Sequence, residues 1–149
     1  MARPKKQINP ESYYTIYNWM LTDLGLSGSK LLAYAFIYAY STNESGKGCY
    51  FGGYEAMSMA IGCTTKNLMK VVQELSTEGL VELQQVILEN TLKRNYYRVS
   101  REPLDMLDMY SSIERDLEVM RKFDDDWADL HRLSKAVVKT KSKSTQRVF

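Results

Sequence analysis

A short apolar segment, a glycine and a second, amphipathic segment follow one another directly between positions 54 and 79, and this succession most constrains how the chain can fold. Tyr54–Ile61 is typical of a short helix, and Gly62 suits the left-handed position that ends one. Thr64 suits the N-cap of a second helix that runs to about Thr77. An apolar stripe at helical spacing marks the buried side of this helix: Leu68, Val72 and Leu75, with Val71 flanking it. The pattern predicts two helices joined by a tight turn.

The segments on either side complete a small domain. Lys30 to about Ser41 is predicted to be a largely buried helix, with Leu32, Ala35, Phe36 and Ala39 at core spacing. Cys49–Phe51 is a candidate for a short strand. After Gly79 the period changes, and Val81 to Ile87 indicates an extended segment with one irregular step. A polar turn at Asn90–Asn95 and a returning strand at Tyr96–Ser100 then predict a β-hairpin.

The order helix, strand, helix, glycine turn, helix and hairpin resembles the bacterial winged helix-turn-helix. The residues that carry the resemblance are Tyr50-Phe-Gly-Gly53, Ala60-Ile-Gly-Cys-Thr64, the helix from Thr65 and the exit Leu75-Ser-Thr-Glu-Gly-Leu-Val-Glu82. With Tyr14-Thr-Ile-Tyr-Asn-Trp19 upstream, the chain is most similar to the N-terminal domains of plasmid replication initiator A proteins and phage replisome organisers. The resemblance implies a mostly α fold with a small β-hairpin wing (α+β), followed by a helical C-terminal extension.

This resemblance implies a double-stranded DNA-binding protein of a bacterium, plasmid or phage, in replication initiation or in transcription regulation. The major groove admits one α-helix, whose N-terminal part meets the base edges. We therefore expect the helix after Thr64 to read DNA with the side opposite its apolar stripe. The candidate contacts are Thr64, Thr65, Lys66, Met69, Lys70 and Gln73. The alternative is that this side is a solvated helix face.

Two further groups of basic residues are candidate DNA contacts. The hairpin turn offers Lys93, Arg94 and Asn95, with Arg98 on the following strand. The N-terminal Arg3, Lys5 and Lys6 are typical of an arm that enters the minor groove. In both places the alternative is a basic segment that is merely solvated.

Charge divides the chain further. Residues 13–100 hold seven bases and seven acids, whereas residues 102–129 hold ten acids and three bases, and residues 135–149 hold five bases and no acid. We expect a flexible basic arm at 1–12, a winged-helix domain at 13–101, a helical extension at 102–138 and a basic tail at 139–149.

The helical extension carries an apolar seam close to a heptad pattern. Its members are Met106, Tyr110, Ile113, Leu117, Met120, Phe123, Trp127 and Leu130. A seam of this length is expected to pair two chains into a homodimer, and the alternative is that it packs back on its own winged helix. The run Asp124-Asp-Asp126 could cap a second helix, so the pattern leaves one long helix and two helices both open.

The residue types argue against an enzyme and against a resident cofactor. There is no GxxxxGK[ST] phosphate loop, and one histidine and two cysteines, Cys49 and Cys63, cannot supply the usual four ligands of a structural zinc ion. The longest apolar run, ten residues at 31–40, is too short to cross a bilayer, and no signal-peptide segment follows the basic N-terminus. We therefore expect a cytoplasmic protein with no metal, no cofactor and no membrane segment.

The balanced charge of residues 13–100 supports a rival hypothesis, because a DNA-binding domain normally has a basic excess. In that hypothesis the winged helix is a scaffold that presents the acidic residues 102–129 to a protein partner, with little DNA binding.

Overall fold

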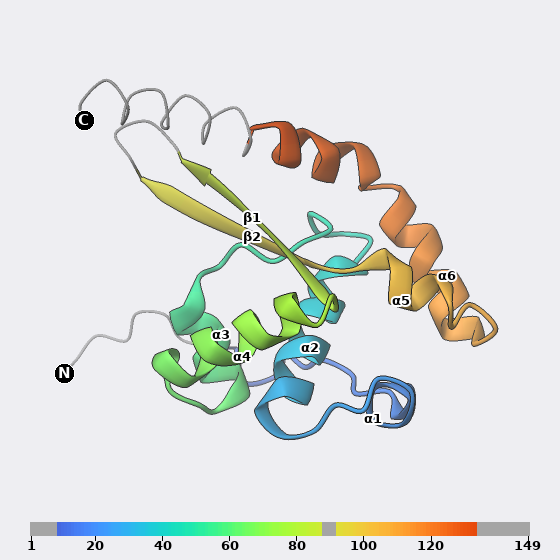
Figure 1. Ribbon diagram of the computed structural model, residues 1–149, viewed down its shortest axis with the longest axis horizontal. Helices are drawn as coiled ribbons and strands as arrows, with labels where there is room; N and C mark the ends of the chain where they lie inside the picture. The colour runs from blue at the N-terminus through green and yellow to red at the C-terminus, as the bar shows by residue number, and fades with distance from the viewer. Residues whose placement is uncertain (1–8, 88–91, 134–149) are drawn as a thin grey trace.

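The computed structural model describes residues 9–87 and 92–133 of the 149-residue chain. Figure 1 shows its elements, which are α1 (Asn18–Thr22), α2 (Gly28–Ser41), α3 (Tyr54–Ile61), α4 (Thr65–Thr77), β1 (Val81–Ile87), β2 (Lys93–Val99), α5 (Arg101–Asp105) and α6 (Ser111–Arg121). A further helix covers residues 124–133. Helices α1–α4 lie on one side of the hairpin, and the helix of residues 124–133 lies on the other (Figure 1).

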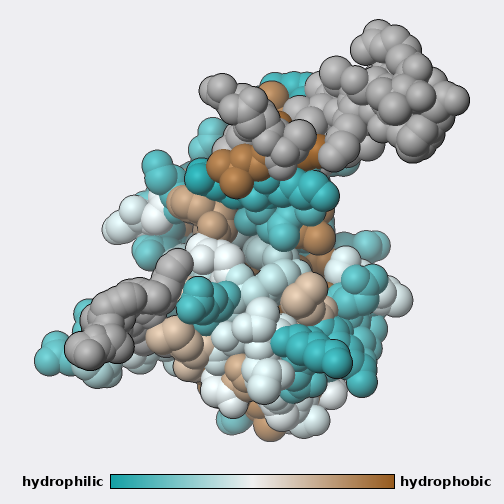
Figure 2. Space-filling model, turned by 90° about the vertical axis from the view of Figure 1, so that its left-hand side faces the viewer, coloured by the Kyte–Doolittle hydropathy of each residue, from teal (hydrophilic) through white to brown (hydrophobic). Residues whose placement is uncertain are grey.

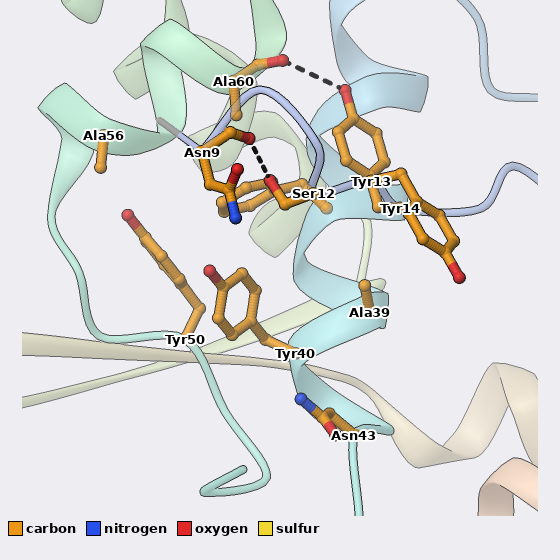
Figure 3. Close-up of a pocket in the computed structure, with 11 residues that line it drawn as sticks. Asn9, Ser12, Tyr13, Tyr14, Ala39, Tyr40, Asn43, Tyr50, Ala56 and Ala60 are labelled. Carbon is orange, nitrogen blue, oxygen red and sulfur yellow. Dashed lines mark hydrogen bonds between the residues drawn. The ribbon is translucent and has the colours of Figure 1, made fainter. Parts of the chain in front are cut away.

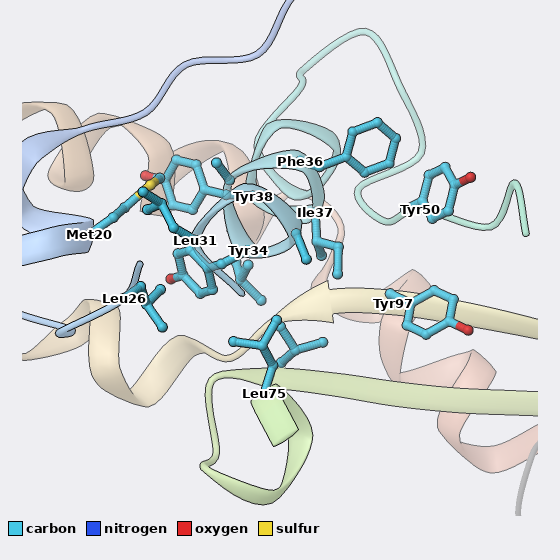
Figure 4. Close-up of a cluster of buried hydrophobic side chains, with 14 of the residues drawn as sticks. Met20, Leu26, Leu31, Tyr34, Phe36, Ile37, Tyr38, Tyr50, Leu75 and Tyr97 are labelled. Carbon is cyan, nitrogen blue, oxygen red and sulfur yellow. The ribbon is translucent and has the colours of Figure 1, made fainter. Parts of the chain in front are cut away.

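α2 is the central helix of the fold. Eight of its 14 residues are buried, and Tyr34 and Ile37 are among the largest fully buried side chains (Figure 4). The prediction of a largely buried helix is confirmed, but its predicted core side was partly wrong because Leu32 and Ala39 are only half-buried. The helix is apolar nearly all round, so its sequence period does not single out one face.

The winged-helix order is confirmed. α3 and α4 follow α2, and β1 and β2 pair antiparallel from Val81 with Val99 to Ile87 with Lys93. The predicted short strand at Cys49–Phe51 is reduced to a bridge, in which the backbone N–H groups of Tyr50 and Tyr97 each donate to the other's carbonyl at 2.8 Å. The fold is mostly α with a small β-hairpin, as the fold class predicted.

The hairpin differs from its prediction in two ways. β2 begins at Lys93, so Lys93–Asn95 belong to the strand and not to the turn. β1 pairs without the expected irregular step. Val81 and Val86 are both buried although their odd separation puts them on opposite faces of the strand. A hairpin covered on both faces explains why the apolar pattern of β1 does not alternate.

The helical extension packs back on its own winged helix, which was the alternative to a pairing seam. Ile113, Leu117 and Met120 are at most 2% exposed and belong to the same core as α2. Tyr38 of α2 donates a hydrogen bond of 2.5 Å to Asp116 of α6. Met106 is 73% exposed. Ile113, Leu117 and Met120 are therefore buried within one chain and cannot form the predicted contact between two chains.

The extension consists of separate helices rather than one. α6 ends at Arg121, and the chain turns at residues 122–123 before the helix of residues 124–133 begins. Phe123 at this break packs on the backbone of Gly48, where a Cβ would lie 2.4 Å from the Phe123 ring. Gly48 also has a φ of +78°, which side chains other than glycine rarely adopt. The break is therefore fixed by a close approach to a loop far away in sequence.

A polar cluster holds the helix of residues 124–133 to the hairpin. The carboxylate of Asp124 accepts hydrogen bonds from Arg98 at 2.8 Å and from Arg101 at 2.7 Å. Trp127 donates to Glu82 of β1 at 2.8 Å. Burial raises the pKa of Asp124, but the hydrogen bonds from both arginines outweigh it, so the pKa lies below its ordinary value. Asp124 is thus the ionised anchor of this contact.

Leu117→Ala and Met106→Ala test whether the extension serves the core of one chain. We expect Leu117→Ala to lower the free energy of unfolding by about 2–5 kcal/mol, because it leaves a cavity in the shared core. Met106→Ala should change the free energy by less than about 0.5 kcal/mol, because the side chain is exposed. Urea unfolding at two protein concentrations, with sedimentation, measures both. A loss of stability in Met106→Ala that depends on protein concentration would instead support the pairing of two chains through this seam.

Asp124→Asn should destabilise the fold by about 2 kcal/mol at neutral pH, because it removes the negative charge that strengthens the hydrogen bonds from Arg98 and Arg101. Since the pKa of Asp124 is lowered in the folded state, its contribution is fully present above pH 3.8 and disappears as the pH falls below that value. The difference between the wild type and the variant should therefore shrink in acid. Asp125→Asn is the matched control, since Asp125 is exposed. Equal effects of the two substitutions would contradict this role.

Candidate nucleic-acid interface

The turn between α3 and α4 positions the candidate reading helix. Gly62 has a φ of +85°, and the backbone N–H groups of Gly62 and Cys63 both donate to the carbonyl of Ser58, at 2.8 and 3.2 Å. This arrangement ends α3 as a glycine C-cap does. The hydroxyl of Thr64 then accepts a hydrogen bond from the backbone N–H of Asn67 at 3.1 Å and caps α4. Thr64 therefore has a structural role at the start of the helix.

α4 has one buried and one exposed side. Its buried residues are those of the predicted stripe, Leu68, Val71, Val72 and Leu75. Its exposed side carries the predicted contact residues Thr65, Lys66, Met69, Lys70 and Gln73, and Met69 is 50% exposed. Within the described part of the chain, the side chains of Lys66, Lys70 and Gln73 make no hydrogen bond or ion pair. The structure thus brings these residues together on one accessible surface, which we call the α4 face.

Charge is unevenly distributed along α4. The acidic residues lie in its last turns and beyond, where Lys30 of α2 donates to Glu78 at 2.6 Å and lies 3.9 Å from Glu74. The lysines lie in the first half of the helix, where no acidic side chain of α4 is present. The N-terminal part of the α4 face is therefore locally positive although the whole domain is balanced. Charges counted over the whole domain cancel and so conceal this asymmetry, and the sequence does not reveal that Lys30 pairs with Glu78, 48 residues away.

The hairpin presents two of its three predicted contact residues. Lys93 and Arg94 are exposed, and the Arg94 guanidinium lies 6.0 Å from the centre of the Phe51 ring. The third residue, Asn95, is half-buried, and its side-chain oxygen accepts a hydrogen bond of 2.9 Å from Gln85. The far end of the hairpin and the first turns of α4 both lie on the left-hand side of Figure 1. In Figure 2, which views that side, the most hydrophobic side chains form small separate patches among hydrophilic ones.

The prediction that Arg98 is a candidate DNA contact is wrong. Its side chain is 5% exposed, and it donates to the Met120 carbonyl and to Asp124, both at 2.8 Å. A guanidinium in this position is a structural cation. Arg3, Lys5 and Lys6, and the predicted tail at 139–149, lie outside the described residues.

Acidic residues approach the hairpin from the helix of residues 124–133. A groove of about 330 Å³ is lined by the basic residues Lys47 and Arg94 and by Asp126 and Asp129 of this helix. These carboxylates lower the positive potential around Arg94. The sequence does not predict this placement, because no local signal shows that the acidic extension folds along the hairpin. The α4 face, which has no such neighbour on its own helix, is the stronger candidate interface.

Two further classes of site are absent from the part of the chain that the structure describes. No group of three or more His, Cys, Asp or Glu side chains there is arranged to hold a metal ion. Among residues 9–87 and 92–133, no helix combines the length and the apolar character needed to span a membrane.

Comparisons with known proteins add little to these observations. No family model matches the chain, and no curated protein is detectably similar to it. Among solved structures, the chain is similar to the transcriptional regulator PA4135, with a TM-score of 0.42 and 11% sequence identity over 87% of this chain and 85% of that one. A likeness this distant assigns neither a fold nor a function.

Proposed function

We propose that this protein binds double-stranded DNA and reads the major groove with the α4 face. One observation carries the proposal: lysine, glutamine, methionine and threonine side chains converge on the exposed side of a capped helix, and none of them is used within the fold. Lysine donates to guanine or phosphate, glutamine pairs with adenine, and methyl groups of Met69 and Thr65 contact thymine methyls. These are the contacts that base readout requires.

The other basic residues would hold the backbone rather than read the bases. Lys93 and Arg94 on the hairpin are suited to phosphates beside the groove. The sequences around Arg3–Lys6 and in the tail supply further cations for phosphate contacts. Asn95 is given no phosphate contact here because its side chain is half-buried against β1 and bonded to Gln85.

We infer a role in replication initiation or transcription regulation of a bacterium, plasmid or phage, acting in the cytoplasm. The replication role is supported by the resemblance of residues 13–100 to replication initiator A and replisome organiser domains. Both roles need the same first step, which is recognition of a DNA site. A homodimer remains part of the proposal only if a surface other than the buried seam pairs the chains.

The second candidate function is a protein-interaction module. It is favoured by the exposed carboxylates of Asp125, Asp126 and Asp129 on the helix of residues 124–133. An acidic helix of this kind suits a basic protein surface. In that case the α4 face would be solvated and DNA binding would be weak.

Substitutions on the α4 face distinguish base readout from a solvated helix. On a duplex selected from random DNA, Gln73→Ala should relax the preference at about one base position, at a cost of about 1–3 kcal/mol if it pairs with adenine. Lys66→Ala and Lys70→Ala should weaken binding, uniformly across sequences for phosphate contacts or selectively for guanine contacts. A fluorescence titration of each variant measures these effects.

The matched control is Lys122→Ala, which removes one positive charge from the surface beyond α6, where Lys122 pairs with Glu44. This variant should bind DNA like the wild type if affinity depends on where a lysine lies and not only on the total charge of the protein. None of the three α4 substitutions should lower the melting temperature, whereas Val72→Ala should, because Val72 is buried. Equal binding by all the surface variants and the wild type would favour the protein-interaction module.

The basic ends of the chain should add affinity without specificity. Deleting residues 1–7 and 139–149 should reduce the slope of log K against log salt by about one unit for each phosphate that is no longer neutralised, because fewer counterions are released. The preferred sequence should stay unchanged. A repeated selection with the shortened chain checks this, and a new preferred sequence would mean that one of the ends reads bases.

A further inference from the structure

An aromatic cavity lies beside α3, away from the α4 face. It has a volume of about 520 Å³, is partly open to solvent and is lined by residues from 9–14, α2, Tyr50 and α3 (Figure 3). Tyr14, Phe36, Tyr40 and Tyr50 supply four rings to its wall. Cavities of about 300–1,000 Å³ with aromatic walls are typical of small-molecule sites. Neither the sequence nor the proposed DNA contacts explain this hollow.

The rings are held in fixed positions by one another. The centres of the Phe36, Tyr40 and Tyr50 rings lie 5.0–5.1 Å apart, and Tyr14 meets Phe36 edge to face at 5.7 Å. Tyr50 donates a hydrogen bond of 2.7 Å to the Gly53 carbonyl. At Gly52, a Cβ would lie 2.7 Å from the Tyr50 hydroxyl, so a glycine is needed to let the ring take this place. The wall is therefore formed before any ligand arrives.

The polar groups of the cavity are few and neutral. No Asp, Glu, Lys or Arg is among the described residues that line it. The hydroxyls of Tyr14 and Tyr50 are used, since they donate to the carbonyls of Ala60 and Gly53. The Tyr40 hydroxyl and the side-chain nitrogen of Asn9 donate no hydrogen bond within the described chain, and Figure 3 shows both directed into the hollow. Two free donors thus face the same space.

We propose that this cavity binds a neutral, planar aromatic small molecule that presents a hydrogen-bond acceptor to Tyr40 and Asn9. A planar ring gains edge-to-face and stacked contacts with the four aromatic walls. A charged ligand is disfavoured because its charge would lose water without meeting an opposite charge. The proposal does not depend on DNA binding, since it uses none of the residues of the α4 face.

Three matched probes test the chemistry of the cavity. They are 2-naphthamide, the isosteric anion 2-naphthoate, and the saturated decahydronaphthalene-2-carboxamide, each titrated into the full chain and followed by amide chemical shifts. The amide should bind about tenfold more tightly than the anion, because the carboxylate loses water and the described lining holds no cation to pair with its charge. It should bind about threefold more tightly than the saturated amide, because a saturated ring cannot make aromatic stacking interactions with the walls. Equal affinities for 2-naphthamide and 2-naphthoate would overturn the proposal.

Three variants locate the site. Ala56→Leu adds bulk from α3, whose Ala56 methyl points towards Tyr50 (Figure 3), and it should weaken 2-naphthamide binding about tenfold by filling the space. Tyr40→Phe keeps the ring, removes only the hydroxyl and should weaken binding about fivefold. Met59→Leu, at an exposed position of the same helix, is the control and should bind like the wild type. Thermal melting confirms folding, and shifts that are unaffected by both cavity variants would place the probe elsewhere and refute the proposal.

Discussion

The burial of α2 is the constraint on which the rest of the structure depends. α1, α3, α4 and β2 all contact this helix, and Tyr38 joins it to α6 through the hydrogen bond to Asp116. Fully burying one large apolar side chain stabilises a fold by about 1.5–3 kcal/mol, so α2 alone accounts for a large share of the stability. Its last residue, Ser41, accepts a hydrogen bond from the backbone N–H of Val99 at 3.1 Å, which fixes the root of the hairpin.

This arrangement makes the extension part of the domain instead of an appendage. α6 completes the core over α2, and the helix of residues 124–133 then covers the second face of the hairpin through Asp124 and Trp127. The acidic residues of the extension thereby approach Arg94, whereas the lysines in the first half of α4 have no acidic partner. The fold thus separates its charges, which the balanced composition conceals.

Local signals in the sequence were sufficient for the parts that local chemistry decides. Gly62 and Thr64 fixed the turn and the bounds of α3 and α4, because a left-handed C-cap and a hydroxyl N-cap depend on few neighbours. The period of α4 also separated its buried stripe from its exposed side correctly. The side of α2 that faces the core was less predictable, since an apolar residue at nearly every position gives no preferred face.

The remaining features depend on contacts between distant segments. The seam of Ile113, Leu117 and Met120 was correctly predicted to be buried, but periodicity does not say whether the covering surface belongs to the same chain. In the sequence, Arg98 has the pattern of a solvated strand residue. Its burial depends on Asp124, which lies 26 residues later and pairs with it. The aromatic cavity likewise combines residues 9–14 with α2 and α3, and no motif within any one of these segments indicates it.

Mapping of backbone amide shifts on addition of a selected duplex tests the central claim most directly. The account predicts that the largest changes fall in the first half of α4, around Lys66 and Lys70, with smaller changes near Lys93 on the hairpin. Residues 124–133 should change little, because their carboxylates repel phosphates. Changes confined to residues 124–133, or no changes with any duplex, would contradict the assignment of α4 as the helix that reads DNA.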